Sequence, residues 1–154
     1  IDNMVAFARP GEVLLAWPPT SDKTQYKAAN QALKILESAT DSKGRQLKVT
    51  KVKMPAPIYL SKKEAKSIST SRYGAKRRHE GDNLLATYIN FYQSSRFVII
   101  PGFGVKEDQA ALEQFKSIFP KKEVIQVYSR EILVGGGNIH CVTMQIPKGV
   151  KYEN

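Results

Sequence analysis

The stretch 97–128, FVIIPGFGVKEDQAALEQFKSIFPKKEVIQVY, contains a complete strand–helix–strand pattern and decides the fold class. Residues 97–100 form a compact apolar run that predicts a buried strand, and residues 124–128 predict a second, short strand. Between them, residues 106–119 begin with two acids, which the dipole of a helix favours in its first turn. This segment carries apolar side chains on one helical face, namely Ala111, Phe115, Ile118 and Phe119.

A second copy of this pattern lies nearer the start of the chain. Residues 13–17 predict a strand, residues 24–39 a helix, and residues 47–54 another strand. The two helices align in register when three apolar positions are matched: Ala29 with Ala111, Leu33 with Phe115, and Leu36 with Ile118. A repeated unit predicts modular α/β architecture, although generic alternation of strands and helices would give the same pattern.

Two further segments lie between the repeated units. Residues 61–79 are rich in Ser, Lys and Arg and have no clear apolar face, so we expect a basic surface excursion there. Residues 84–95, LLATYINFYQSS, contain β-branched and aromatic side chains and predict another strand.

Length and composition limit the class of protein. With 154 residues, of which 42% are hydrophobic and 25% charged, the chain supports one modest globular core. Its single cysteine excludes an intrachain disulfide, and the sequence contains no signal-type start and no apolar run long enough for a bilayer. We therefore expect a soluble protein of a reducing, cytoplasmic compartment with no membrane partner.

The formal net charge of +10 is the one unusual global feature. Much of it comes from residues 43–78, where twelve Lys and Arg side chains accompany a single acid, Glu64. Such a balance can indicate binding to phosphates, but the chain has no helix-turn-helix pattern, zinc-ligand set or aromatic RNA-binding signature. A solvated basic face is the favoured interpretation, and nucleic acid is a disfavoured partner.

The segment 135–143, GGGNIHCVT, places the only cysteine, Cys141, six residues after the first of three glycines. Three consecutive glycines indicate unusual torsions or a close approach by another group. A cysteine attacks as its thiolate and needs a base or a positive field. In an extended segment His140 would point away from Cys141, and His79 could serve only if the fold brought it back. On these grounds alone, a small core cysteine is the favoured interpretation, and His and Cys ligands are too few to predict a metal site.

The residues REILVGGGNIHCVTMQIP, 130–147, resemble the C-terminal signature of agmatine deiminases, a group that also includes the bacterial peptidylarginine deiminases. Three other stretches agree with that family in order and spacing. They are IDNMVAFARPGEVLLAW at 1–17, ATYINFYQSSRFVIIPGFG at 86–104, and ALEQFKSIFPKKEVIQV at 111–127. The resemblance covers nearly the whole chain except the lysine-rich excursion.

The resemblance implies a pentein-type α/β propeller, built of about five ββαβ units around a central pocket. Residues 1–154 would be the C-terminal part, about half, of one pentein catalytic domain, and the two repeated units would be two of its blades. No cofactor is implied.

The resemblance also implies the chemistry. Cys141 would attack the guanidinium carbon of agmatine, expel ammonia and leave a thiouronium adduct that water hydrolyses to N-carbamoylputrescine. Gly135, Gly136 and Gly137 would let the backbone approach the substrate and set the angle of a strand, with Asn138 beside them in the active-site loop. His140 would have no catalytic role.

The first residues match a Gly-His-x-Asp motif of this family from its third position, so that Ile1 is the x and Asp2 the carboxylate that grips the guanidinium. The resemblance places the histidine, a glutamate and a further aspartate in an N-terminal half outside these residues. We therefore expect the 154 residues alone to be inactive and poorly soluble unless that half is bound.

The partners implied are agmatine, that N-terminal half and a second copy in a homodimer. A peptidylarginine deiminase is one alternative. A noncatalytic module that binds an anionic partner through the basic face is another.

Overall fold

The protein is described by a computed structural model that covers residues 3–68 and 78–146. Its first unit is a three-stranded sheet with one helix. The sheet has the order β1-β2-β3, with β1 antiparallel to β2 and β2 parallel to β3. The elements are β1 (Val5–Arg9), β2 (Glu12–Trp17), α1 (Lys23–Ser38) and β3 (Lys48–Lys53).

The second unit has the same ββαβ topology. Its sheet has the order β6-β7-β8, with β6 antiparallel to β7 and β7 parallel to β8. The elements are β6 (Tyr92–Gln93), β7 (Phe97–Gly102), α3 (Glu107–Ile118) and β8 (Glu123–Tyr128). The six elements predicted from the two sequence patterns are therefore present within two residues of their expected bounds.

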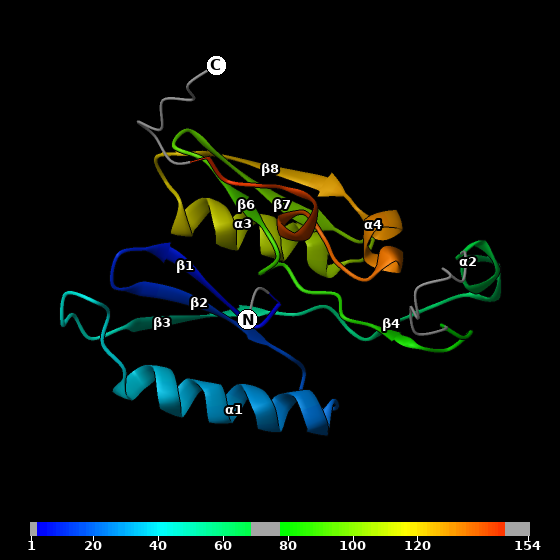
Figure 1. The fold of residues 1–154 in the computed structure, drawn as a ribbon, viewed down its shortest axis with the longest axis horizontal. Coiled ribbons are helices and arrows are strands. Elements are labelled where there is room, and N and C mark those ends of the chain that lie inside the picture. Colours follow the sequence, from blue (N-terminus) through cyan, green and yellow to red (C-terminus); the bar gives the residue numbers. More distant parts are fainter. Residues whose placement is uncertain (1–2, 69–77, 147–154) are drawn as a thin grey trace, which may run out of the picture.

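The two units stack in layers, as Figure 1 shows. Helix α1 covers one face of the first sheet, and α3 lies between the two sheets, where it contacts both β8 and β3. Side-chain hydrogen bonds join the units directly: Gln114 donates to the carbonyl of Lys51 at 2.7 Å, Gln93 donates to the carbonyl of Ala8 at 3.2 Å, and Arg9 donates to the carbonyl of Ile118.

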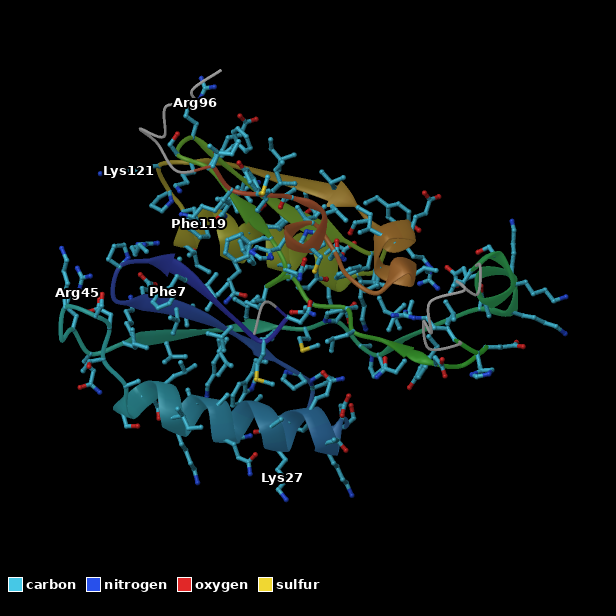
Figure 2. All side chains as sticks on the ribbon, in the orientation of Figure 1. Phe7, Lys27, Arg45, Arg96, Phe119 and Lys121 are labelled. Carbon is cyan, nitrogen blue, oxygen red and sulfur yellow. The ribbon has the colours of Figure 1, made fainter. Side chains whose placement is uncertain are left out.

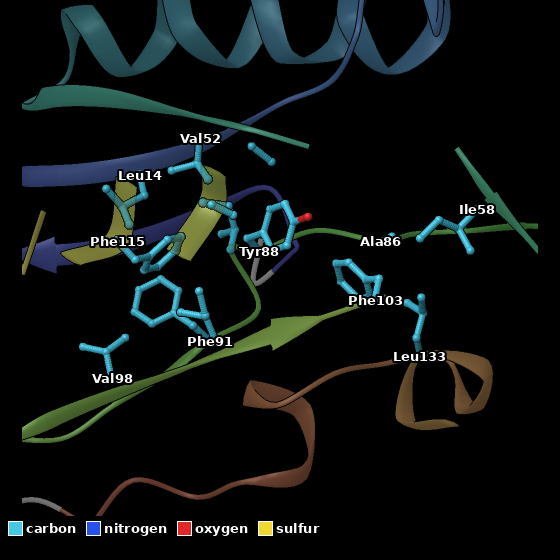
Figure 3. Close-up of a cluster of buried hydrophobic side chains, with 14 of the residues drawn as sticks. Leu14, Val52, Ile58, Ala86, Tyr88, Phe91, Val98, Phe103, Phe115 and Leu133 are labelled. Atoms are coloured by element: carbon cyan, nitrogen blue, oxygen red, sulfur yellow. The ribbon is translucent and has the colours of Figure 1, made fainter. Parts of the chain in front are cut away.

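The main core fills the space between the first sheet and the second unit. Leu14 and Val52 of the first sheet approach Phe115 of α3, which in turn packs edge-to-face on Phe91 with ring centroids 5.2 Å apart (Figure 3). Strand β2 is buried on both faces, because α1 lies on its other side. That double burial explains why β2 reads as a continuous apolar run.

The connection between the units differs from the sequence prediction. It contains β4 (Ile58–Tyr59), α2 (Lys62–Ser67) and β5 (Asn83–Leu84), with β4 antiparallel to β5. The short helix α2 lies within the predicted basic excursion and has no buried residue. Its start is a capping box, in which Ser61 accepts from the backbone of Glu64 and the Glu64 carboxylate accepts from the backbone of Ser61.

The prediction of one strand over residues 84–95 was wrong. Only its two ends belong to strands, as the last residue of β5 and the two residues of β6. The middle is an irregular segment with six consecutive buried side chains: Ala86, Thr87, Tyr88, Ile89, Asn90 and Phe91. Two of these are polar and find partners in this segment or in distant loops, which a regular strand with alternating faces would not allow.

The prediction of an extended conformation around residue 141 was also wrong. The chain forms a short helix, α4 (Arg130–Gly135), then a turn and a single 3-10 turn, η1 (His140–Val142). The argument that His140 and Cys141 lie on opposite sides of a strand therefore does not apply.

The basic side chains are spread over the surface. Figure 2 shows Lys27 pointing outward from α1, Arg45 at the turn beyond that helix, and Lys121 at the far end of the second unit. These three labelled side chains are exposed and lie on separate parts of the molecule. Among the described residues, no helix is long and apolar enough to cross a membrane.

Candidate functional site

Helix α4 begins where β8 ends and is held to the second sheet. The backbone N–H of Ser129 donates to the carbonyl of Gly102 at 2.9 Å, and Leu133 and Val134 are buried. The helix ends at Gly136, which has a φ of 105° and donates its N–H to the carbonyl of Leu133. This left-handed conformation requires glycine, because a Cβ would be strained there.

The next glycine brings the backbone against the cysteine. A Cβ built on Gly137 would lie 2.7 Å from the Cβ of Cys141 and 3.0 Å from its Sγ, closer than two such atoms approach. By contrast, a Cβ on Gly135 would meet nothing within 4 Å. Two of the three glycines therefore have separate structural reasons, one to end α4 and one to admit the side chain of Cys141.

Cys141 is exposed and takes part in no disulfide. The interpretation as a small core cysteine is therefore wrong, because the thiol lies at the surface in η1 rather than in an apolar strand. The exposed thiol can react with a molecule that reaches this face of the protein.

Asn90 contacts Cys141 from the interior of the protein. The exposed fraction of Asn90 is 0%. Its side-chain Nδ2 donates to Cys141 Sγ at 3.1 Å. Its Oδ1 accepts from the backbone N–H of His140 at 2.9 Å and from that of Cys141 at 3.4 Å. One buried amide therefore contacts both the sulfur and the backbone of the turn that carries it.

The start of the first unit reaches the same place. Asn90 Nδ2 also donates to the Oδ1 of Asn3 at 2.9 Å, which joins residues 87 positions apart in the sequence. Asp2, the predicted guanidinium ligand, lies outside the described residues.

Asn138 supports the turn between α4 and η1. Its side chain is 2% exposed, and its Oδ1 accepts from the backbone N–H of Ile139 at 2.9 Å. Its carbonyl accepts from the N–H of Val142 at 3.3 Å. Among the described residues, its buried Nδ2 meets no hydrogen-bond partner.

A cavity of about 570 Å³ borders the glycine turn. Its lining residues come from both ends of the described chain and from the connection between the units: Asn3, Arg78, His79, Asp82, Asn83, Leu85, Leu133, Gly136 and Gly137. The fold therefore brings His79, which is distant from Cys141 in the sequence, to the cavity wall that Gly137 also lines. Cys141 packs on Gly137 beside this wall.

Two charged groups of the cavity lie close to identified partners. The guanidinium of Arg78 approaches Gly136, where a Cβ would be only 2.6 Å from Nη2. The carboxylate of Asp82 accepts from the backbone N–H of His79 at 2.8 Å. The wall thus contains a guanidinium cation and a carboxylate, and a polar substrate could contact either.

An ion pair ties α4 to α2. Arg130 donates through Nε to Glu64 Oε1 at 2.7 Å and through Nη2 to Glu64 Oε2 at 3.1 Å. The Arg130 guanidinium, and then the hydroxyl and backbone N–H of Ser61, hold the pKa of Glu64 at about 2, well below its ordinary value of 4.5. This bidentate contact fixes the only acid of the basic stretch 43–78 against the first turn of α4.

The described residues contain no group of three or more His, Cys, Asp and Glu side chains that could hold a metal ion. The chemistry that the arrangement offers is that of an exposed thiol held by a buried amide at the edge of a polar cavity.

Sequence reasoning missed Asn90, Asn3 and Arg78. Their type and spacing carry no signal, since each lies far from Cys141 along the chain. Asn90 was hidden by the strand interpretation of LLATYINFYQSS, in which two buried polar residues among apolar ones could have indicated a functional turn.

Comparisons with known proteins identify the family of the chain. The sequence profile of the Porphyromonas-type peptidyl-arginine deiminases matches residues 1–147. A relative from Listeria monocytogenes, named as a predicted agmatine deiminase, is 42% identical over 97% of this chain and 41% of its own length. The chain therefore spans about two fifths of the length of such relatives.

Solved structures show the same fold. A structure of agmatine deiminase of Enterococcus faecalis is 38% identical, with a TM-score of 0.86, and the match covers 97% of this chain and 40% of the other. An arginine deiminase structure from Porphyromonas gingivalis, so named on prediction, is 26% identical with a TM-score of 0.77 and similar coverage. The resemblance stated from the signature at 130–147 is confirmed, and the chain belongs to the Porphyromonas-type peptidyl-arginine deiminase family.

Proposed function

We propose that this chain supplies the nucleophile of an agmatine deiminase, which converts agmatine and water to N-carbamoylputrescine and ammonia. The observation that carries the proposal is the placement of Cys141. Its exposed thiol packs on Gly137, a wall residue of the 570 Å³ cavity, in a chain with 38% identity to agmatine deiminase of Enterococcus faecalis.

The proposed reaction has two steps. The sulfur of Cys141 bonds to the guanidinium carbon, and the bond from that carbon to a terminal nitrogen breaks, so that ammonia leaves with a proton gained from the site. Water then adds to the same carbon of the thiouronium adduct, the carbon–sulfur bond breaks, and the thiolate is regenerated.

The proposed site needs more acids than the described wall provides. A buried guanidinium requires carboxylates on more than one side, and Asp82 is the only Asp or Glu among the described residues that line the cavity. We propose that Asp2 and residues beyond these 154 complete the clamp, as blades of a closed pentein-type propeller. Exposed apolar side chains of β8, of η1 and of the segment after η1 are consistent with such a neighbour: Ile125, Val127, Tyr128, Val142, Met144 and Ile146.

The test is ammonia release from agmatine by the complete gene product, together with any polypeptide that forms its N-terminal half. We expect turnover by the parent and none by Cys141→Ser, with both folded by circular dichroism. The variant Gly135→Ala is a matched control in the same loop, since its added methyl meets nothing. Unchanged turnover in Cys141→Ser would exclude the proposal.

A peptidylarginine deiminase is the second candidate, because the matching family carries that name. The same assay with a blocked arginine peptide separates the two. Faster release from the peptide than from agmatine would favour the second candidate and leave the role of Cys141 unchanged.

A further inference from the structure

We infer that Asn90 is a positioning residue for the nucleophile: its side-chain amide donates to the Cys141 sulfur and holds that sulfur in one position beside Gly137. This inference rests on the proposed role of Cys141 as a nucleophile. It adds a residue from the middle of the chain, 51 positions away from the cysteine in sequence.

The orientation of the Asn90 amide follows from its neighbours. Two backbone N–H groups, of His140 and Cys141, point at one end of the side chain. Only the oxygen can accept from both, so the NH₂ end must face Sγ, 3.1 Å away. The sulfur therefore meets the donor end of this amide.

The position of Asn90 is fixed on several sides. The side chain is completely buried, and its neighbours Thr87, Tyr88, Ile89 and Phe91 are buried as well. Its carbonyl also accepts from the N–H of His140 at 3.3 Å, and Asn3 accepts from Nδ2. The amide cannot follow a sulfur that moves, so it selects one position of the thiol.

The hydrogen bond from Asn90 limits the directions in which the sulfur can point. The same contact keeps Sγ directed past Gly137, where the chain leaves no space for any side chain. Asn90 would thus set the direction from which Cys141 attacks.

A purely structural role is the alternative. In that case the amide serves only to hold the backbone of η1 through its oxygen, and its NH₂ group has no effect on reactivity. The substitution Asn90→Asp separates these roles, because it retains the oxygen acceptor and replaces the donor with a second oxygen. Asn90→Ser provides a smaller polar variant whose hydroxyl is too short to reach Sγ.

The experiment measures the alkylation of Cys141 by iodoacetamide at neutral pH in the complete gene product, followed by mass spectrometry on the tryptic peptide 131–148. We expect Asn90→Asp and Asn90→Ser to react at least about tenfold more slowly than the parent, in line with the loss of the side-chain hydrogen bond that positions the sulfur. Thr87→Val is the matched control: it removes a buried hydroxyl that bonds only the N–H of Ile89 at 3.2 Å, and its rate should stay within about twofold of the parent.

A folded Asn90 variant that reacts at the parental rate would overturn the inference, as would an equal slowing by Thr87→Val. If neither Asn90 variant folds, the parent is compared with itself in urea, where Cys141 should react more slowly than in the native protein; a faster reaction in urea would overturn the inference. Because alkylation needs no substrate, a failure of agmatine turnover with these rates as expected would count against the proposed function alone.

Discussion

The two ββαβ units share a topology but not an environment. Ala29 of α1 and Ala111 of α3 occupy matching positions and are both buried, at 2% and 5% exposed. At the next matching position, Leu33 is only half-buried, whereas Phe115 is 0% exposed. Helix α1 has a sheet on one side, and α3 has a sheet on each side.

The units also differ in their connection to the candidate site. The first unit reaches it through its start, where Asn3 accepts from Asn90. The second unit holds the preceding segment through α3, since Tyr88 donates to Asp108 at 2.8 Å two residues before Asn90. One sequence pattern can therefore form either an outer layer or the support of a site, depending on what packs against its helix.

The largest expected effect is on stability, at the matched helix positions. Phe115→Ala removes a fully buried ring and should cost about 3–5 kcal/mol of unfolding free energy. Leu33→Ala should cost less than half of that, because its side chain is already partly in water. Urea denaturation of both variants checks this, and equal losses would show that the two helices are equivalent layers.

The glycine turn after the second unit should be sensitive at one position. Gly137→Ala forces a methyl to within 2.7 Å of the Cys141 side chain and should cost about 1–3 kcal/mol by overpacking. We expect it to displace the sulfur and to slow alkylation of Cys141. Gly135→Ala, in open space, is the control, and equal rates for the two variants would remove the structural reason for Gly137.

The helix starts offer a third comparison. The carboxylate of Asp108 accepts from the backbone N–H groups of Phe103, Gly104 and Val105 and from the hydroxyl of Tyr88, while the carboxylate of Asp22 accepts from the backbone and side chain of Gln25. Asp22→Ala should cost about 1 kcal/mol, and Asp108→Ala about 2 kcal/mol or more.

The same pair tests the connection to the site. Asp108→Ala frees the segment before Asn90 and should also slow the alkylation of Cys141, whereas Asp22→Ala should leave that rate unchanged. Thermal melts and peptide-level alkylation measure both quantities, and an unchanged rate in Asp108→Ala would separate α3 from the site.

The smallest effect concerns pH. The pKa of Glu64 is lowered from 4.5 to about 2, so its pairing with Arg130 contributes fully above about pH 4.5 and is lost as the pH falls through about 2. The contribution of this partly exposed pair should be below about 1 kcal/mol. The free energy of unfolding of Glu64→Gln should therefore be lower than that of the parent near neutral pH, and the two values should become equal near pH 2. A constant difference across that range would mean that the carboxylate does not titrate as the ion pair requires.

The repeated units could be predicted because each depends on local patterns. Apolar runs and helical spacing in residues 97–128 determine strands and a helix with little help from distant residues. The family signature likewise singled out Cys141 by its sequence neighbours. The glycine run indicated special torsions, which Gly136 confirms with its φ of 105°.

The rest of the site could not be predicted, because it depends on contacts between distant segments. Asn90 reaches Cys141 across 51 positions, and Arg130 reaches Glu64 across 66. The two-stranded sheet of β4 and β5 and the turn over residues 85–91 have no period that sequence analysis detects. These contacts join segments that lie far apart in the sequence and meet in the folded structure.

The central claim is that Cys141 forms a covalent bond to the carbon of the substrate guanidinium. The most direct measurement is an acid quench of the complete gene product during agmatine turnover, followed by mass spectrometry of the tryptic peptide 131–148. We predict an amidino adduct on Cys141 that appears within one turnover and disappears when agmatine is exhausted. Steady ammonia release with this peptide unmodified at every time, and undiminished in Cys141→Ser, would contradict it.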